Sequence, residues 1–324
     1  RCKQIGLVPS GGRTGLSGGA VALNGEVVVS FDKMNHLGPV DTVNRTVVCQ
    51  PGVITQALQE HAAESELYFP VDFASAGSSQ IGGNIATNAG GINVIRYGMT
   101  RDWVAGLKVV TGTGELLDLN KGLIKNNTGY DFRHLFVGSE GTLGFIVEAT
   151  MRLTSRPARS DVVLLGVSKM ADTMHILDAF RKAATLNAFE FFSDRALEKV
   201  LKHTGASAPL SSRSHYYALI ELENASAQDE DDILGAFEIC FDNEWAEDGV
   251  ISRGHQQAEE LWRCREQISE TISQWTPYKN DISVPVSRVP DFLNAVETVV
   301  SKAYSDLEII WFLKEVNYYL FYSL

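Results

Sequence analysis

The chain has 324 residues, of which 44% are hydrophobic and 21% charged, a composition typical of a globular protein large enough for two domains. Its formal net charge of −12 argues against a nucleic-acid partner and against an anionic membrane surface, since both require clustered basic residues. No apolar run reaches the roughly 18 residues that span a bilayer, so we expect no transmembrane segment and a cytoplasmic protein, or one of the mitochondrial matrix in a eukaryote.

The first half of the chain is predicted to contain two hairpins, one helix and one long strand. Asn24-Gly25 lies between apolar runs in residues 22–29, and residues 112–114 separate two apolar runs between residues 107 and 119. Residues 53–64 have a helical pattern, and residues 145–153 alternate as a half-buried strand does.

A change of composition at residues 156–159 predicts a domain boundary, with one domain at 1–156 and a second at 157–324. Beyond it we expect strands at 162–167 and 215–222. Helices are predicted at 170–185, 226–241 and 256–275. The resulting prediction is an α+β protein whose second domain packs helices on one face of an antiparallel sheet.

The cysteines and histidines give no sign of a metal site. Cys2, Cys49, Cys240 and Cys264 are far apart and lack C-x-x-C spacing, which argues against a zinc ribbon or a redox dithiol. We expect free thiols, although the sequence leaves disulfides open. The seven histidines show no H-x-x-x-H spacing, so no metal ligands are assigned.

Three loops of small residues stand out: the first loop (9–19), the second loop (70–91) and the third loop (138–144). The first loop has five glycines in eleven residues, and its unshielded backbone N–H groups could cradle a pyrophosphate. It is neither a Walker loop, because Gly-Lys-Ser/Thr is absent, nor a Rossmann fingerprint, because no helix pattern follows. One such loop could be a plain linker, but three in one domain favour a large dinucleotide held by backbone contacts.

These loops, in this order and with residues 96–102 (RYGMTRD) and 125–131 (KNNTGYD), resemble the PCMH-type FAD-binding domain of the vanillyl-alcohol-oxidase superfamily. The resemblance is to the branch that holds D-lactate dehydrogenase, the glycolate oxidase D subunit and D-2-hydroxyglutarate dehydrogenase, and it extends to about residue 308. It implies a PCMH-type domain followed by an α+β cap domain with an antiparallel sheet, and non-covalently bound FAD.

The resemblance also implies which residues contact FAD. Those expected around the pyrophosphate are Pro9, Ser10, Gly11, Gly12, Arg13, Thr14, Gly15 and Leu16. Those expected along the flavin and ribityl side are Gly77, Ser78, Gly82, Gly83, Thr87 and Asn88. Glu140, Gly141 and Ile146 are expected to contact the adenine half.

Arg265 is the strongest candidate on the substrate side. Arg263 has Glu259 and Glu260 within helical reach, whereas Arg265 has no acid there and flanks an apolar stripe. A partly buried guanidinium needs an anion, which is either an acid elsewhere in the fold or a substrate carboxylate. The resemblance implies the second, with Arg265, Ser269 and Lys279 as substrate contacts.

The implied activity is oxidation of a D-2-hydroxy acid, of the D-2-hydroxyglutarate or D-lactate type, to the 2-oxo acid by hydride transfer to flavin N5. The family's histidine motif is expected after residues 307–312 but does not occur, so the catalytic base is unknown. We therefore expect a chain cut short at both ends, which could be inactive alone.

Two other functions remain open. One is a different flavin oxidase of the same fold, acting on an alcohol or an aldonolactone, and the other is a non-catalytic FAD-binding fragment. The chain has no second nucleotide fingerprint, so an electron-transfer protein or a quinone is a better electron acceptor than NAD. A homodimer is compatible with the sequence.

Overall fold

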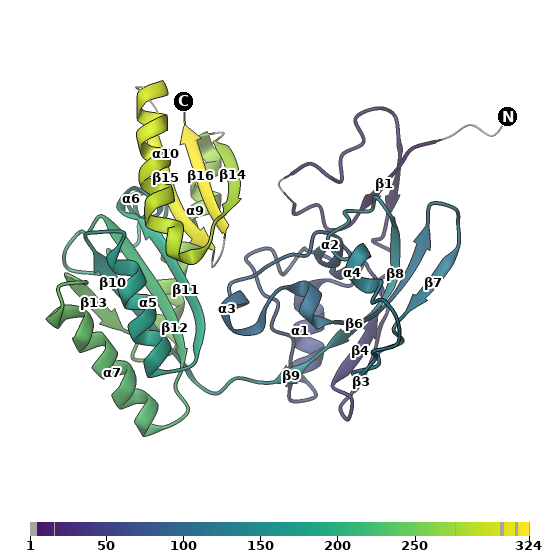
Figure 1. Ribbon diagram of the computed structural model, residues 1–324, viewed down its shortest axis with the longest axis horizontal. Coiled ribbons are helices and arrows are strands. Elements are labelled where there is room, and N and C mark those ends of the chain that lie inside the picture. The colour runs from purple at the N-terminus through teal and green to yellow at the C-terminus, as the bar shows by residue number, and fades with distance from the viewer. Residues whose placement is uncertain (1–4, 16, 276, 305–307, 315–316, 324) are drawn as a thin grey trace. The chain divides into compact units, whose positions relative to one another are not determined.

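A computed structural model describes residues 5–15, 17–275, 277–304, 308–314 and 317–323, without the side chains of 278–281 and 313–323. The chain divides into two compact units, Arg1–Arg156 and Pro157–Leu324. Each unit has its own sheet and helices (Figure 1). In the described part of the chain, no helix is both long and apolar enough to cross a membrane.

Unit 1 is built on a five-stranded antiparallel sheet in the order β3-β4-β8-β6-β7. Its strands are β3 (Leu37–Asp41), β4 (Thr46–Cys49), β8 (Gly144–Arg152), β6 (Val104–Thr111) and β7 (Leu116–Leu119). Two short strands, β5 (Leu67–Tyr68) and β9 (Thr154–Ser155), pair separately. The predicted hairpin between residues 107 and 119 and the predicted strand at 145–153 are therefore confirmed as β6–β7 and β8.

Helices α1 (Thr55–Ala63) and α2 (Ile81–Ala86) supply apolar side chains to the core on one face of this sheet. Leu58 and Ile85 are fully buried there against Val109 of β6 and Met151 of β8. The remaining short helices of the unit are α3 (Val94–Tyr97), η1 (Thr100–Trp103) and α4 (Arg133–Phe136). Helix α2 lies within the second loop, and the third loop runs into β8, so this core positions both loops.

The predicted hairpin at residues 22–29 is wrong. Strand β2 (Val27–Ser30) pairs in parallel with β1 (Leu7–Ser10), and residues 22–24 form no strand. The carboxylate of Glu26 accepts hydrogen bonds from the backbone N–H and the side chain of Asn24, which makes a local turn that leads into β2. Asn24-Gly25 therefore marks a turn, but β2 forms its hydrogen bonds with β1 and not with the residues just before the turn.

Unit 2 contains a seven-stranded sheet in the order β13-β10-β12-β11-β15-β16-β14, and all its recorded strand pairs are antiparallel. Its strands are β10 (Ser160–Val167), β11 (Leu186–Ser193), β12 (Tyr216–Glu223), β13 (Asp248–Ile251), β14 (Tyr278–Ser283), β15 (Glu308–Lys314) and β16 (Asn317–Ser323). The antiparallel sheet expected for the cap domain is confirmed.

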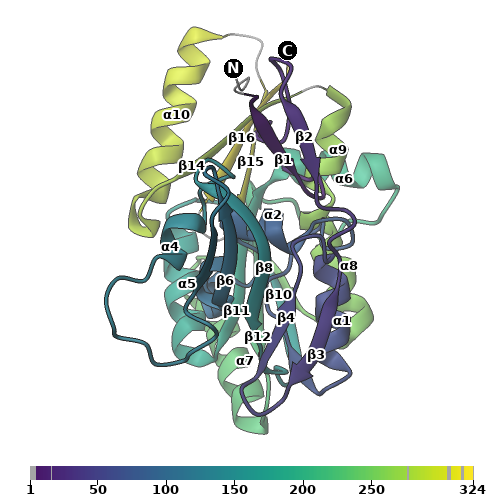
Figure 2. The ribbon, with the colours of Figure 1, turned by 90° about the vertical axis from the view of Figure 1, so that its right-hand side faces the viewer.

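Helices cover both faces of this sheet, whereas the sequence predicted one covered face. Figures 1 and 2 show α5 (Asp172–Ala183), α7 (Ala227–Asp242) and α10 (Val289–Ala303) on one side, and α6 (Asp194–Thr204), α8 (His255–Glu266) and α9 (Ile268–Ile272) on the other. Neighbouring residues of β11 contact helices on opposite faces of the sheet, because successive side chains of a strand point to opposite faces. Phe191 packs with α10, while Glu190 contacts α8.

The predicted long helix at 256–275 is interrupted. Helix α8 ends at Glu266, α9 begins at Ile268, and a 3-10 turn (η2, Ser273–Trp275) follows. Gln267, with φ −77° and ψ −5°, lies between them outside the helical ψ range. The predicted apolar stripe is nevertheless buried on both sides of the break, at Leu261, Cys264, Ile268 and Ile272.

The three described cysteines, Cys49, Cys240 and Cys264, are free and buried, whereas Cys2 lies outside the described residues. Burial raises the pKa of Cys49 and of Cys240 to about 12 and that of Cys264 to about 11. Because the thiolate is the reactive species, we expect these three residues to resist iodoacetamide at pH 8 until the protein is unfolded. Peptide mass spectrometry before and after denaturation would check this, and alkylation of a native buried cysteine would contradict it.

Candidate functional site

The three glycine-rich loops of unit 1 lie against one another. A Cβ added to Gly12 of the first loop would stand 2.3 Å from the carbonyl oxygen of Ser78 in the second loop. One added to Gly141, which follows Glu140 in the third loop, would stand 2.5 Å from Cγ of Pro9. Real Cβ atoms do not approach other atoms this closely, so glycine is required for the loops to meet.

Each loop also contains one non-glycine residue in the left-handed region. These are Arg13 (φ 57°), Asn88 (φ 47°) and Glu140 (φ 50°), all three predicted FAD contacts. The third loop is tied to the end of α2 by backbone hydrogen bonds from Gly138 to Ile85 (3.0 Å) and from Glu140 to Ala86 (2.9 Å). Such conformations persist only where surrounding contacts impose them, and they concentrate at ligand sites.

Several predicted FAD contacts present backbone to their surroundings. Added Cβ atoms on Gly15 and Gly83 would meet nothing within 4 Å, so a ligand could approach the backbone there. The side chain of Asn88 is engaged locally: its oxygen accepts from the N–H of Arg101 (3.0 Å), and its NH2 contacts Sδ of Met99 (3.6 Å). The hydroxyl of Thr87 donates to the carbonyl of Gly83.

The structure gives other predicted contacts a packing role. Gly82 lies against Pro51, where a Cβ would come within 2.4 Å of the proline Cβ. Ile146 is buried in the core of unit 1, 7% exposed. A contact of Ile146 with adenine stays a prediction, and Leu16 lies outside the described residues.

Asp32 and Gln80 connect the first and second loops. Gln80 donates from Nε2 to Oδ1 of Asp32 (2.8 Å), and Nη2 of Arg13 lies 3.7 Å from Oδ2 of the same carboxylate. The amide of Gln80, followed by the hydroxyl of Ser30, holds the pKa of Asp32 below its ordinary value. The oxygen of the same amide, Oε1, is buried and has no hydrogen-bond partner among the described residues.

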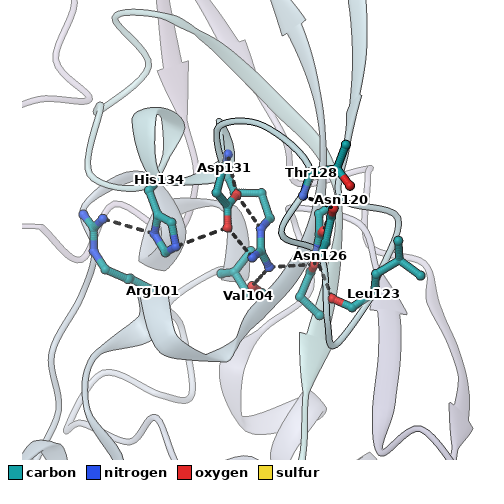
Figure 3. Close-up of polar contacts among 10 residues, drawn as sticks. Arg101, Val104, Asn120, Leu123, Asn126, Thr128, Asp131 and His134 are labelled. Carbon is teal, nitrogen blue, oxygen red and sulfur yellow. Dashed lines mark hydrogen bonds and ion pairs between the residues drawn. The ribbon is translucent and has the colours of Figure 1, made fainter.

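The segment 120–134, which contains the KNNTGYD motif, is held by a polar network (Figure 3). Arg133 donates to the carbonyls of Val104 (2.6 Å) and Ala105 (2.7 Å) in β6 and to Asp131 (2.9 Å), and this guanidinium lowers the pKa of Asp131. Asn120 also donates to the carbonyl of Ala105, at 2.7 Å. Arg133 and Asn120, which flank the motif on its two sides, therefore anchor this loop to the central sheet.

His134 extends this network towards the second loop. Figure 3 shows it between Arg101 and Asp131, with Nδ1 3.3 Å from Nη1 of Arg101 and Nε2 3.5 Å from Oδ2 of Asp131. Arg101 also donates from Nη2 to the carbonyl of Val137, next to the third loop. Since the backbone of Arg101 holds Asn88, the network supports the second loop.

In unit 2, Arg265 forms a buried ion pair. Its Nε lies 2.6 Å from Oε2 of Glu190, with side-chain exposures of 8% and 0%, and its guanidinium carbon stands 4.6 Å from the ring centre of Phe312. The sequence left two partners open for Arg265, an acid elsewhere in the fold or a substrate carboxylate. The structure shows an acid, Glu190. Arg263, as predicted, pairs loosely with Glu259 at 3.9 Å.

The other two predicted substrate contacts lie near this cluster in sequence. Ser269 is partly buried in α9, one turn beyond Arg265. Lys279 lies in β14, opposite Phe321 of β16, and its side chain is outside the described residues. Among the residues that the structure describes, no group of three or more His, Cys, Asp or Glu side chains is arranged to hold a metal ion.

Comparison with known families identifies both units. Residues 1–120 match the family described as "FAD binding domain", and residues 156–313 match "FAD linked oxidases, C-terminal domain". The chain belongs to the FAD-linked oxidases. The predicted cofactor, FAD, and the predicted PCMH-type resemblance are thereby confirmed.

Curated relatives of this FAD-linked oxidase are named D-2-hydroxyglutarate dehydrogenase. One from Stutzerimonas stutzeri is 58% identical over 309 residues, covering 95% of this chain and 67% of the relative. A mitochondrial one from Bos taurus is 36% identical over 298 residues, covering 90% of this chain and 54% of the relative. The chain thus spans about two thirds of the bacterial relative and just over half of the mitochondrial one.

Solved structures support the fold alone. An alkyldihydroxyacetonephosphate synthase superposes with a TM-score of 0.75 at 19% identity, covering 98% of this chain and 63% of that one. A p-cresol methylhydroxylase superposes with a TM-score of 0.73 at 13% identity, covering 99% of this chain and 70% of that one.

The residues of unit 1 fit FAD. The three loops converge with glycines that leave backbone accessible at Gly15 and Gly83, and beside Gly11 the side chain of Gln80 presents a buried acceptor that has no partner in the described part of the chain. Reasoning from the sequence missed Gln80, Asp32 and Glu190, because the partner of each side chain is distant in the chain. The signal available for Gln80 was its place inside the second loop, directly before Ile81 and Gly82.

Proposed function

We propose that this FAD-linked oxidase acts on a D-2-hydroxy acid, with D-2-hydroxyglutarate as the preferred substrate, and produces the 2-oxo acid. The observation that carries the proposal is 58% identity over 95% of the chain to a relative named D-2-hydroxyglutarate dehydrogenase. The bound cofactor supplies the two-electron acceptor for this chemistry. The convergent glycine loops support non-covalent binding of FAD, since backbone contacts suffice to hold a dinucleotide.

The substrate site is proposed to use Arg265, Ser269 and Lys279. A guanidinium carries five N–H donors in one plane, and Glu190 receives the one on Nε, which fixes the orientation of that plane. A second cation at Lys279 suits a dicarboxylate better than a monocarboxylate. We further propose an electron-transfer protein or a quinone as acceptor, a cytoplasmic or mitochondrial-matrix location, and a homodimer as the assembly to test.

The first experiment is a visible spectrum of the purified protein, followed by anaerobic addition of D-2-hydroxyglutarate. Binding of FAD gives the two visible absorption bands of an oxidised flavin, and the proposal predicts that the substrate bleaches them. A neutral alcohol is expected not to do so. A flavin that is bleached by the alcohol and not by the hydroxy acid would favour an alcohol oxidase of the same fold, and a flavin that neither compound reduces would favour a non-catalytic FAD-binding protein.

Replacement of Lys279 by methionine tests the preference for a dicarboxylate. We expect the KM for D-2-hydroxyglutarate to rise about tenfold or more, because a charge-assisted hydrogen bond contributes about 1.5–3 kcal/mol, and the KM for D-lactate to change little. Lys302→Met, on the exposed surface of α10, is the control and should change neither. Equal increases for the two substrates would contradict a role in selecting the second carboxylate.

A further inference from the structure

Gln80 occupies a buried position where the first and second loops meet. We propose that Gln80 is a cofactor-binding residue whose Nε2 holds Asp32 beside the first loop and whose Oε1 accepts a hydrogen bond from a sugar hydroxyl of FAD. This inference rests on the assignment of FAD to unit 1 and adds a contact outside the residues predicted above.

The geometry fixes which end of the amide faces which partner. Gln80 precedes α2, its backbone bridges to Ile54, and its side chain is enclosed, with the residue only 8% exposed. Nε2 lies 2.8 Å from Oδ1 of Asp32. An ionised carboxylate only accepts hydrogen bonds, so the NH2 group must face Asp32, and the opposite orientation would place two oxygens together.

The remaining atom, Oε1, is buried and has no partner among the described residues. Buried acceptors are almost always hydrogen-bonded, and one that is not carries a free-energy cost. A Cβ placed on Gly11 would lie 3.3 Å from Oε1, so the atom borders the first loop at a residue that has no side chain. A ligand lying along that loop can reach Oε1.

The chemistry of FAD indicates which of its groups meets Oε1. The pyrophosphate offers acceptors only, so it cannot satisfy another acceptor and belongs on the N–H groups of the loops. The donors next to the pyrophosphate in FAD are the ribityl and ribose hydroxyls. Gln80 therefore fixes the position of FAD along the first loop: a sugar hydroxyl donates to Oε1, and the phosphates accept from the backbone N–H groups.

Asp32 links this contact to the first loop. Its second carboxylate oxygen lies 3.7 Å from Nη2 of Arg13, which has left-handed backbone. The series of contacts Gln80–Asp32–Arg13 thus joins the start of α2 to the first loop, and the Gln80–Asp32 contact alone links residues 48 positions apart. The side chain of Gln80 would therefore both contact FAD and, through Asp32, hold the first loop in place.

Gln80→Met tests the proposal, because it keeps the length of the side chain and removes the amide, both the acceptor Oε1 and the Nε2 donor to Asp32. The affinity is measured by titrating the apoprotein with FAD and following the quenching of flavin fluorescence. We expect the Kd of the variant for FAD to be about tenfold higher than that of the unaltered protein. The thermal midpoint of the apoprotein should change little, since the loss of the hydrogen bond to Asp32 is offset by the removal of a buried acceptor that has no partner among the described residues. Gln256→Met is the control: Gln256 donates to Oε1 of Glu260 (3.1 Å) within α8 of unit 2, so its loss should leave the Kd for FAD unchanged.

Two results would overturn the proposal. If Gln80→Met binds FAD as the unaltered protein does, no hydroxyl meets Oε1. If the variant loses FAD affinity only together with a lower apoprotein midpoint, Gln80 is structural alone. Failure of the unaltered protein to quench FAD fluorescence would instead contradict FAD binding by this chain, and with it the proposed function.

Discussion

Glu190→Leu is expected to lower the free energy of unfolding by about 3–5 kcal/mol, the range observed when one partner of a buried ion pair is removed. Glu190 is fully buried, and its loss would leave the guanidinium of Arg265 enclosed without its carboxylate. Chemical denaturation followed by circular dichroism measures the change. The control is Glu198→Leu, since Glu198 is 60% exposed where it pairs with Arg213, and an exposed pair contributes about 0–1 kcal/mol.

The double variant Glu190→Leu/Arg265→Met separates the ion pair from simple packing. Replacing both members by apolar groups of similar size removes the buried charge, so the double variant should be more stable than Glu190→Leu alone. A double variant that is less stable than the single one would show that Arg265 does not depend on Glu190. Arg265 is also a proposed substrate contact, and Glu190 fixes its orientation. Glu190→Leu alone should therefore also raise the KM for the hydroxy acid.

Gly12→Ala is expected to weaken FAD binding by about tenfold or more and to lower the free energy of unfolding by about 1–3 kcal/mol, the usual cost of overpacking. The added methyl would lie 2.3 Å from the carbonyl oxygen of Ser78 and 2.9 Å from Cα of Ser79. Both neighbours are backbone, so the first and second loops must separate. Fluorescence titration with FAD and thermal unfolding of the apoprotein measure the two effects.

Gly112→Ala is the control, because a Cβ at Gly112 in the β6–β7 turn would meet nothing within 4 Å. It should leave the affinity for FAD and the thermal midpoint nearly unchanged. If Gly12→Ala bound FAD normally, the close contact of the two loops would not be part of the cofactor site, and the role of the first loop in pyrophosphate binding would need to be revised.

Features that depend on a few neighbouring residues were predictable from the sequence. The β6–β7 hairpin forms around Gly114, whose φ of +85° is unstrained for glycine but costly for other residues. Helix α7 begins where Ser226 accepts a hydrogen bond from the N–H of Asp229, a local cap. The three glycine-rich loops could be recognised for the same reason, because a nest of backbone N–H groups is a property of a short segment.

Features that depend on a partner distant in the chain required the tertiary structure. Strand β2 pairs with β1 and not with the adjacent residues 22–24, helices cover both faces of the second sheet, and the predicted helix at 256–275 breaks at Gln267. Arg265 reads in the sequence as a buried cation in need of an anion, but Glu190 lies 75 residues away. Periodicity shows that a side chain is buried, whereas only the packing of distant segments decides which group lies opposite it, and hence whether its charge or hydrogen bond is satisfied.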